Sequence, residues 1–219
     1  MNQHSAIRSR RAWITLLVVV ALGLAADLVS KSVAFARIAP QPVAIDRDAV
    51  LAAQSRGESL SRLIPPNIEP VTIVPGGLDL TLVLNPGAVF GIGAGKRWFF
   101  VAFTLGALAL AVWMFGAWTR ARDTGAHIGI GLLVAGGVGN LYDRLAYGCV
   151  RDFIHPLPGV RLPFGWSMPL SGGREVWPYV SNIADLWLLV GIGMLMVFLW
   201  RQGSKKQRPQ PGKTDPSAA

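Results

Sequence analysis

Residues 98–118 read WFFVAFTLGALALAVWMFGAW and contain no charged side chain. A helix of about 21 residues is about 30 Å long, which matches the hydrocarbon core of a bilayer. Tryptophan stands at both ends of the stretch, where the two membrane–water interfaces would lie. The stretch therefore predicts a membrane-spanning helix, and this decides the class of fold.

Three further apolar stretches, residues 12–36, 127–147 and 183–200, are also long enough to cross a membrane. The composition agrees, because 52% of the residues are hydrophobic and only 15% are charged, against about 25% charged in ordinary soluble domains. We therefore expect an all-α membrane protein, with a bundle of four transmembrane helices built by one domain over residues 12–202.

The basic residues indicate how this bundle is oriented. The N-terminal tail (1–11), the loop 119–126 and the polar C-terminal tail carry many Lys and Arg, whereas the loops 37–97 and 148–182 are nearly balanced in charge. The positive-inside rule then places both termini in the cytoplasm and the two long loops on the opposite side of the membrane. The net charge of +9 is thus a topology signal, and we expect no nucleic-acid partner. The tail 203–219 is expected to be disordered.

The first external loop contains a pattern typical of a strand. Residues 78–84 read LDLTLVL, which places every leucine on one face, and residues 71–74 precede a Pro-Gly-Gly turn. We expect a small external β-sheet that forms a cradle on the outer face, and a short helix within residues 49–63. The region 155–178 is rich in Pro, Gly and Trp and is expected to be a surface loop.

Several polar residues lie within the apolar stretches, where they are costly and usually functional. Asn140, Asp143 and Arg144 are spaced to share one helix face. For Asp143, an Asp–Arg pair that cross-links helices is as good an explanation as a functional role. Asp27 and Lys31 are four residues apart, and an intrahelical ion pair explains both without chemistry.

Asp152 and Asp185 are harder to explain as structural residues. Asp152 lies just beyond the outer end of the third stretch, and Asp185 lies in the first turn of the fourth, so both reach the same depth. Two carboxylates in close contact share one proton. One can then take a proton from water while the other donates to a carbonyl, as in aspartic peptidases. We expect no metal and no cofactor, because no His spacing typical of a metal site occurs and Cys149 has no evident catalytic partner.

The order of several motifs resembles the signal peptidase II family, the bacterial lipoprotein signal peptidases. The matching segments are Asp27-Leu-Val-Ser-Lys31, Asn85-Pro-Gly-Ala-Val-Phe-Gly91, Gly139-Asn-Leu-Tyr-Asp-Arg144, Gly148-Cys-Val-Arg-Asp-Phe153 and Asn182-Ile-Ala-Asp185. The resemblance covers nearly the whole membrane part of the chain. It departs from the family pattern at Val89 and Ser181 and in the long external regions 38–70 and 156–177.

The resemblance implies a membrane aspartic endopeptidase that cuts the signal peptide from a diacylglyceryl-modified prolipoprotein, just before the lipidated cysteine. It implies that Asp152 and Asp185 are the catalytic pair. Substrate-binding residues would be Asn85, Gly87, Asn140, Arg144 and Asn182, with structural support from Asp27, Lys31 and Asp143. Its partners would be the prolipoprotein and membrane lipid, and we expect a monomer.

The alternative is a four-helix transporter or proton-relay subunit, in which the intramembrane charges form an ion path. A transporter tends to show repeated halves with broken helices, which this sequence lacks. A relay would also spread its acidic residues across the bilayer, whereas here they cluster towards one end.

Overall fold

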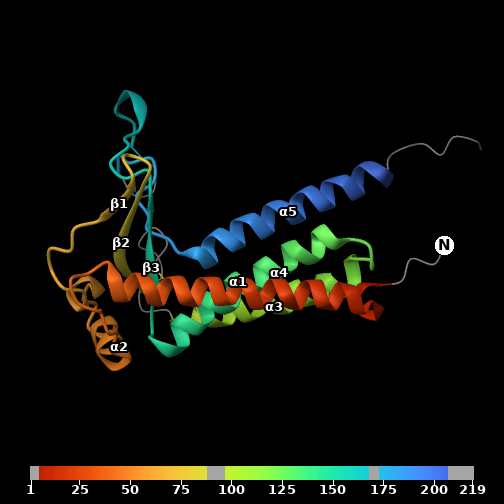
Figure 1. Cartoon of the computed structure of the whole chain (residues 1–219), viewed down its shortest axis with the longest axis horizontal. Helices are drawn as coiled ribbons and strands as arrows, with labels where there is room; N and C mark the ends of the chain where they lie inside the picture. Colours follow the sequence, from red (N-terminus) through yellow and green to blue (C-terminus); the bar gives the residue numbers. More distant parts are fainter. Residues whose placement is uncertain (1–4, 88–96, 168–172, 207–219) are drawn as a thin grey trace, which may run out of the picture.

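The computed structural model describes residues 5–87, 97–167 and 173–206. Four long helices, α1 (Arg10–Arg37), α3 (Arg97–Trp118), α4 (Thr124–Ala146) and α5 (Ile183–Lys206), lie over the four apolar stretches and are long and apolar enough to span a membrane. They run roughly along one direction in Figure 1. Helix α5 continues six residues beyond the expected end at residue 200, and the rest of the tail lies outside the described residues.

Helix α4 is the centre of the bundle. It packs against α1, α3 and α5. In its most apolar 18-residue stretch, 56% of the residues are buried, against 17–22% in the corresponding stretches of the other three helices. Glycine makes this close packing possible, because it lets backbones and side chains of neighbouring helices approach α4 directly. A β-carbon on Gly136 would overlap the backbone carbonyl of Ala184 in α5, and one on Gly139 would overlap the carboxylate of Asp27 in α1.

The contact at Gly139 gives a test of this packing. Gly139→Ala should lower the unfolding free energy by about 1–3 kcal/mol, because the added methyl group forces α1 away from α4. Gly106→Ala in α3 is the matched control, since a β-carbon on Gly106 would meet nothing within 4 Å and alanine favours the helix. Thermal unfolding in detergent should therefore show a lower transition temperature for Gly139→Ala only. Equal transitions for the two variants would contradict this packing.

The sheet has three antiparallel strands in the order β1 (Val71–Val74), β2 (Leu78–Asn85) and β3 (Val150–Pro156). The hairpin of β1 and β2 confirms the strand prediction. Strand β3 was not predicted, because the segment after the third apolar stretch was expected to be a helix end followed by a surface loop. It pairs along β2, with Val83 opposite Asp152 and Asn85 opposite Val150. Figure 1 shows the strands at one end of the bundle, running across the direction of the helices.

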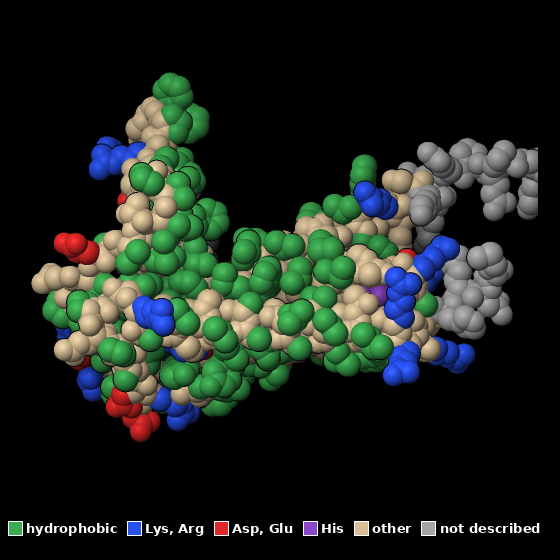
Figure 2. All heavy atoms as spheres, in the orientation of Figure 1, with side chains coloured by type: hydrophobic (Ala, Val, Ile, Leu, Met, Phe, Trp, Pro, Cys, Tyr) green, Lys and Arg blue, Asp and Glu red, His purple; other side chains and the backbone are tan. Residues whose placement is uncertain are grey.

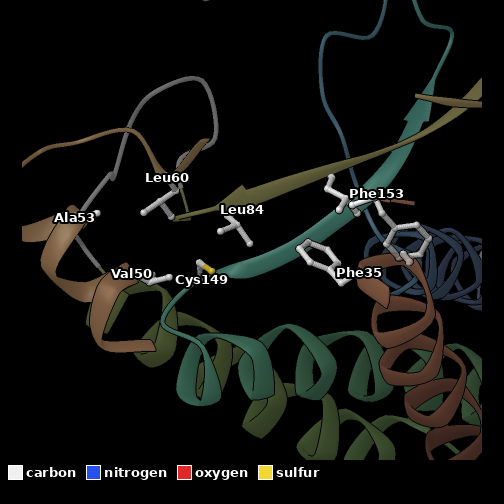
Figure 3. Close-up of a cluster of buried hydrophobic side chains, with 10 residues drawn as sticks. Phe35, Val50, Ala53, Leu60, Leu84, Cys149 and Phe153 are labelled. Atoms are coloured by element: carbon white, nitrogen blue, oxygen red, sulfur yellow. The ribbon is translucent and has the colours of Figure 1, made fainter. Parts of the chain in front are cut away.

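A second core lies beneath this sheet. Helix α2 (Arg47–Ser55) and the short helix η2 (Leu60–Leu63) occupy the region where one short helix was expected. Figure 3 shows their side chains facing those of β2, β3 and α1. The labelled members of this buried cluster are Phe35, Val50, Ala53, Leu60, Leu84, Cys149 and Phe153. The cluster fixes β2 and β3 relative to α1, and so fixes the residues on the other face of these strands.

The side-chain distribution follows this architecture. Figure 2 shows hydrophobic side chains around the length of the bundle, Lys and Arg gathered at the end opposite the sheet, and charges of both signs around the sheet end. The short helix η1 (Ala6–Arg8) packs at the basic end, where the amide of Ala6 donates to the carbonyl of Thr119. A belt of apolar side chains between two charged ends is the surface expected of a protein that crosses a bilayer.

Candidate active site

The polar residues predicted from sequence meet where the helical bundle joins the sheet. Asp152 comes from β3, Asn85 from the end of β2, Asn140 from α4, and Asn182 and Asp185 from the start of α5. Hydrogen bonds connect all five side chains. Segments from distant parts of the chain therefore form one polar cluster.

Asp152 is held by two amide groups. The Nδ2 of Asn182 donates to its Oδ1 at 2.6 Å, and the Nδ2 of Asn85 donates to its Oδ2 at 3.0 Å. The residue is only 1% exposed. Burial raises the pKa of this carboxyl group to about 7, and the negative charge of Asp185 acts in the same direction. Asp152 therefore holds a proton well above the pH at which an ordinary aspartate loses one.

Asp185 is linked to Asp152 through Asn182, which donates a hydrogen bond to each of the two carboxyl groups. The Nδ2 of Asn140 donates to its Oδ1 at 2.8 Å, and the backbone amide of Asn182 donates to its Oδ2 at 3.2 Å. In return, the amide of Asp185 donates to the Oδ1 of Asn182 at 3.1 Å, so the two residues cap the start of α5 reciprocally. Asn182 thus contacts both carboxyl groups. This cap occupies only one of the two carboxylate oxygens of Asp185.

A second, fully buried cluster lies next to these residues. The Nζ of Lys31 is 2.8 Å from Asp27 and 3.4 Å from Asp143, and it donates to the Oδ1 of Asn140 at 3.0 Å. Asp27 also accepts a hydrogen bond from the amide of Ala184 at 2.9 Å. The Asp27–Lys31 pair is confirmed, but it is more than intrahelical, because it joins α1 to α4 and to the first turn of α5.

Asp143 forms an ion pair with an arginine, as the structural account expected. Asp143 pairs with Arg151 rather than with its neighbour Arg144: Nη2 of Arg151 is 2.8 Å from Oδ1, and the amide of Arg151 donates to Oδ2 at 3.0 Å. The guanidinium of Arg151 also stacks 4.3 Å from the ring centroid of Tyr147. The sequence does not predict this pair, because Asp143 and Arg151 are eight residues apart with a turn between them, and helical spacing does not apply across a turn. This pair fixes the start of β3, and with it Asp152.

Arg144 instead faces a groove. Within the described residues it makes no ion pair, and its Nη1 donates to the carbonyl of Asn140 at 3.2 Å. The groove has a volume of about 440 Å³ between α3, α4 and α5, and Arg144 and Asp185 both line it. The rest of its lining is mainly apolar, with Phe100, Phe103, Leu108 and Leu188 among the lining residues. An apolar channel within the bundle therefore leads to one of the two carboxyl groups.

The turn after β2 positions Asn85. Its Oδ1 accepts the amide hydrogen of Gly87 at 2.9 Å, which leaves its Nδ2 free to donate to Asp152. Gly87 has φ +96°, and a β-carbon there would lie 2.7 Å from the ring of Phe100. Gly87 therefore serves the turn and its contact with α3. The neighbouring Val89 and the glycine-rich residues 91–96 lie outside the described residues.

A resident metal ion has no evident ligand set in the parts of the chain that the structure describes, since no group of three His, Cys, Asp or Glu side chains is close enough to hold one. The amide-rich cluster fits proton transfer, because in the described residues it positions two carboxyl groups by hydrogen bonds and neither forms an ion pair. One of them, Asp152, is buried and the other, Asp185, is half-buried, and carboxyl groups in such surroundings are candidates for general acid–base chemistry.

These features define a multi-pass membrane protein with a polar cluster between a four-helix bundle and a three-stranded sheet. The chain belongs to the signal peptidase II family, whose model, described as "Signal peptidase (SPase) II", matches residues 19–201. It is similar to the lipoprotein signal peptidase of Desulfitobacterium hafniense, with 32% identity over 142 residues, which cover 65% of this chain and 82% of the relative. The lipoprotein signal peptidase of Methylobacterium radiotolerans is 37% identical over 145 residues, covering 64% and 73% of the two chains.

The fold is also similar to a solved structure, described as a bacterial membrane enzyme determined by the in meso method at 2.3 Å resolution. The TM-score is 0.59, and the match covers 90% of this chain and 94% of the other at 23% sequence identity. This likeness supports the arrangement of the helices and the sheet. The family membership identifies the chain as a peptidase, and it does not favour the transporter or proton-relay alternative.

Proposed function

We propose that this protein is an aspartic endopeptidase in which Asp152 and Asp185 cleave the signal peptide from a diacylglyceryl-modified prolipoprotein. The cleavage of prolipoprotein signal peptides follows from the family to which the chain belongs. The observation that carries the aspartic mechanism is the position of Asn182, which hydrogen-bonds to both carboxyl groups at the end of the bundle. Neither aspartate forms an ion pair within the described residues.

The two carboxyl groups would divide the chemistry between them. Asp152, with its raised pKa, carries the shared proton and donates it to the oxygen of the scissile carbonyl. Asp185 removes a proton from the attacking water, so that the hydroxyl adds to the carbonyl carbon and a tetrahedral intermediate forms. Collapse of this intermediate breaks the C–N bond: the leaving amine takes the proton that Asp185 accepted from water, and a hydroxyl of the intermediate returns a proton to Asp152 as the new carboxyl group forms. The amides of Asn85, Asn140 and Asn182 hold both carboxyl groups in position throughout.

The apolar groove explains how a membrane-embedded substrate reaches these residues. A signal peptide contains an apolar segment of about 7–15 residues, and this segment would lie among the side chains of α3, α4 and α5. The scissile bond would then lie beside Asp185 at the end of the groove. Arg144, which lines the same groove, would bind backbone carbonyl groups of the peptide there. The lipidated cysteine follows the cut, and the sheet would serve as a cradle on that side.

The proposed topology follows from the distribution of charge. Basic residues at the end away from the sheet favour both termini in the cytoplasm and the active site at the outer face of the inner membrane. A lipid-anchored substrate presents its scissile bond at that boundary. A monomer contains every residue that this mechanism uses.

The raised pKa of Asp152 gives a pH prediction. A carboxyl whose pKa is raised from 3.8 to about 7 prefers its protonated form in the folded state, and this preference is lost as the pH rises through about 7. The turnover number should therefore fall above pH about 7, because the dyad loses its only proton donor. The unfolding free energy should fall at lower pH, between 3.8 and about 7, because only the folded state keeps this proton there, and the fall should be smaller in Asp152→Asn. A turnover number that continues to rise above pH 8 would contradict the assignment of the proton to Asp152.

Analysis of the reaction products tests the proposed function. Purified protein should convert a diacylglyceryl-modified prolipoprotein into two fragments, and mass spectrometry should place the cut immediately before the modified cysteine. An unmodified precursor with the same sequence is the control, and it should be cleaved much more slowly because it lacks the lipid anchor. A cut at another position, or equal cleavage of both precursors, would contradict the proposal.

A further inference from the structure

A hairpin extends from the sheet beyond the core that holds the active site. It consists of residues 157–167 and 173–177, between β3 and the start of α5. The two arms are joined by a bridge between Arg161 and Glu175, and by hydrogen bonds from Leu162 to Arg174 and from Val176 to Val160. We call this segment the outer hairpin. In Figure 1 it continues the direction of the sheet and projects sideways from the end of the bundle.

The described part of the tip carries aromatic side chains that nothing in the described chain covers. Phe164 is 89% exposed and Trp166 is 65% exposed, and their ring centroids are 6.0 Å apart. Phe164 also has φ +59°, in the left-handed region that a bulky side chain rarely adopts. Two large rings are therefore held out from the fold, one of them by a backbone conformation that costs energy, and no packing within the described residues explains this arrangement.

The outer hairpin and the sheet have two different sides. Figure 2 shows hydrophobic side chains over the side that faces the helical bundle, whereas Lys and Arg and Asp and Glu side chains project on the other side. Exposed apolar residues continue along the hairpin arms, with Leu157 and Trp177 each 39% exposed. The apolar side thus faces the half-space that the membrane helices occupy, and the charged side faces away from it.

We propose that the outer hairpin is a membrane-interface finger that lies on the leaflet at the sheet end of the bundle and inserts Phe164 and Trp166 among the lipid headgroups. Both ends of the hairpin begin at the membrane boundary, because β3 carries Asp152 and the second arm leads directly into α5. A strip that projects sideways from this level runs along the bilayer surface. Aromatic rings prefer the headgroup region of a bilayer.

The outer hairpin gives the sheet a second attachment to the membrane, at a distance from the helices. Its function would be to hold the sheet at a fixed height over the boundary where the scissile bond lies. The proposal uses the membrane topology of the proposed function but not its chemistry, so it can fail while the peptidase assignment stands.

A fluorescent probe at the tip tests the proposal. Cys149 is fully buried, so the unchanged chain serves as the blank for thiol labelling. Phe164→Cys, labelled with an environment-sensitive NBD group, should emit at shorter wavelength in phospholipid nanodiscs and should be quenched by lipids that carry a nitroxide near the headgroup. Glu69→Cys is the matched control, because this exposed residue precedes β1. Its label should be quenched by aqueous iodide instead.

The quenching pattern separates the possible contacts. Equal quenching of both labels by iodide would show that the tip lies in water, which overturns the proposal. A shift to shorter wavelength without nitroxide quenching would assign the tip to a protein contact, which also overturns it. Activity of each labelled variant on a lipidated precursor reports separately on the proposed function.

Discussion

Asp152→Asn and Asp185→Asn should each lower the turnover number by about 10³-fold or more, because each removes one half of the proton transfer. Asparagine has nearly the shape of aspartate and keeps one carbonyl oxygen to accept from Asn182 or Asn140. Both variants should therefore insert and fold. The measurement is the rate of signal-peptide release from a lipidated precursor at saturating enzyme.

The matched control for these variants is Asp79→Asn. Asp79 lies on β2, outside the polar cluster, and pairs with strand positions on both sides through its backbone. Its substitution should leave the rate unchanged. Near-normal turnover in either Asp152→Asn or Asp185→Asn would remove that residue from the catalytic pair, whereas retained substrate binding with lost turnover would support the assignment.

Lys31→Met should destabilise the protein by about 3–5 kcal/mol, because it leaves buried carboxylates without their cation. Lys31 is fully buried and contacts Asp27 within its own helix and Asn140 and Asp143 in α4. The loss should appear as a lower thermal transition of the purified protein in detergent and as a lower yield from the membrane.

A double variant separates the effect of charge from the effect of lost packing. Asp27→Asn combined with Lys31→Met removes one carboxylate together with the cation, while Asp143 keeps its pair with Arg151. This variant should recover part of the lost stability. A single Lys31→Met variant as stable as the wild type, or a double variant less stable than the single, would contradict the structural role of this cluster.

The four helices could be predicted from the sequence because hydropathy over about 20 residues is a local signal. The β1–β2 hairpin was equally readable, since LDLTLVL alternates and a Gly-Gly turn precedes it. Strand β3 was not, because Arg151 and Asp152 interrupt its apolar pattern. Arg151 pairs with Asp143, and Asp152 accepts hydrogen bonds from Asn85 and Asn182. These partners belong to other elements of the fold, so a local sequence pattern cannot reveal them.

In the candidate site, too, some residues could be predicted from local sequence and others only from the folded structure. Asp152 and Asp185 could be selected by depth, because each lies at the outer end of an apolar stretch without a cation at helical spacing. The function of Lys31 was underestimated, since its helical spacing to Asp27 accounts for only one of its three partners. The bridging role of Asn182 depends on the distance between α4, α5 and β3, which only the folded structure contains.

The most direct test of the catalytic pair is an electrophoretic mobility assay of a diacylglyceryl-modified prolipoprotein with the wild type and with Asp185→Asn in the same detergent. The pair predicts complete conversion to the shorter, lipidated product by the wild type and an unchanged precursor with the variant. Cleavage by the folded Asp185→Asn variant at the wild-type rate would contradict the aspartic mechanism.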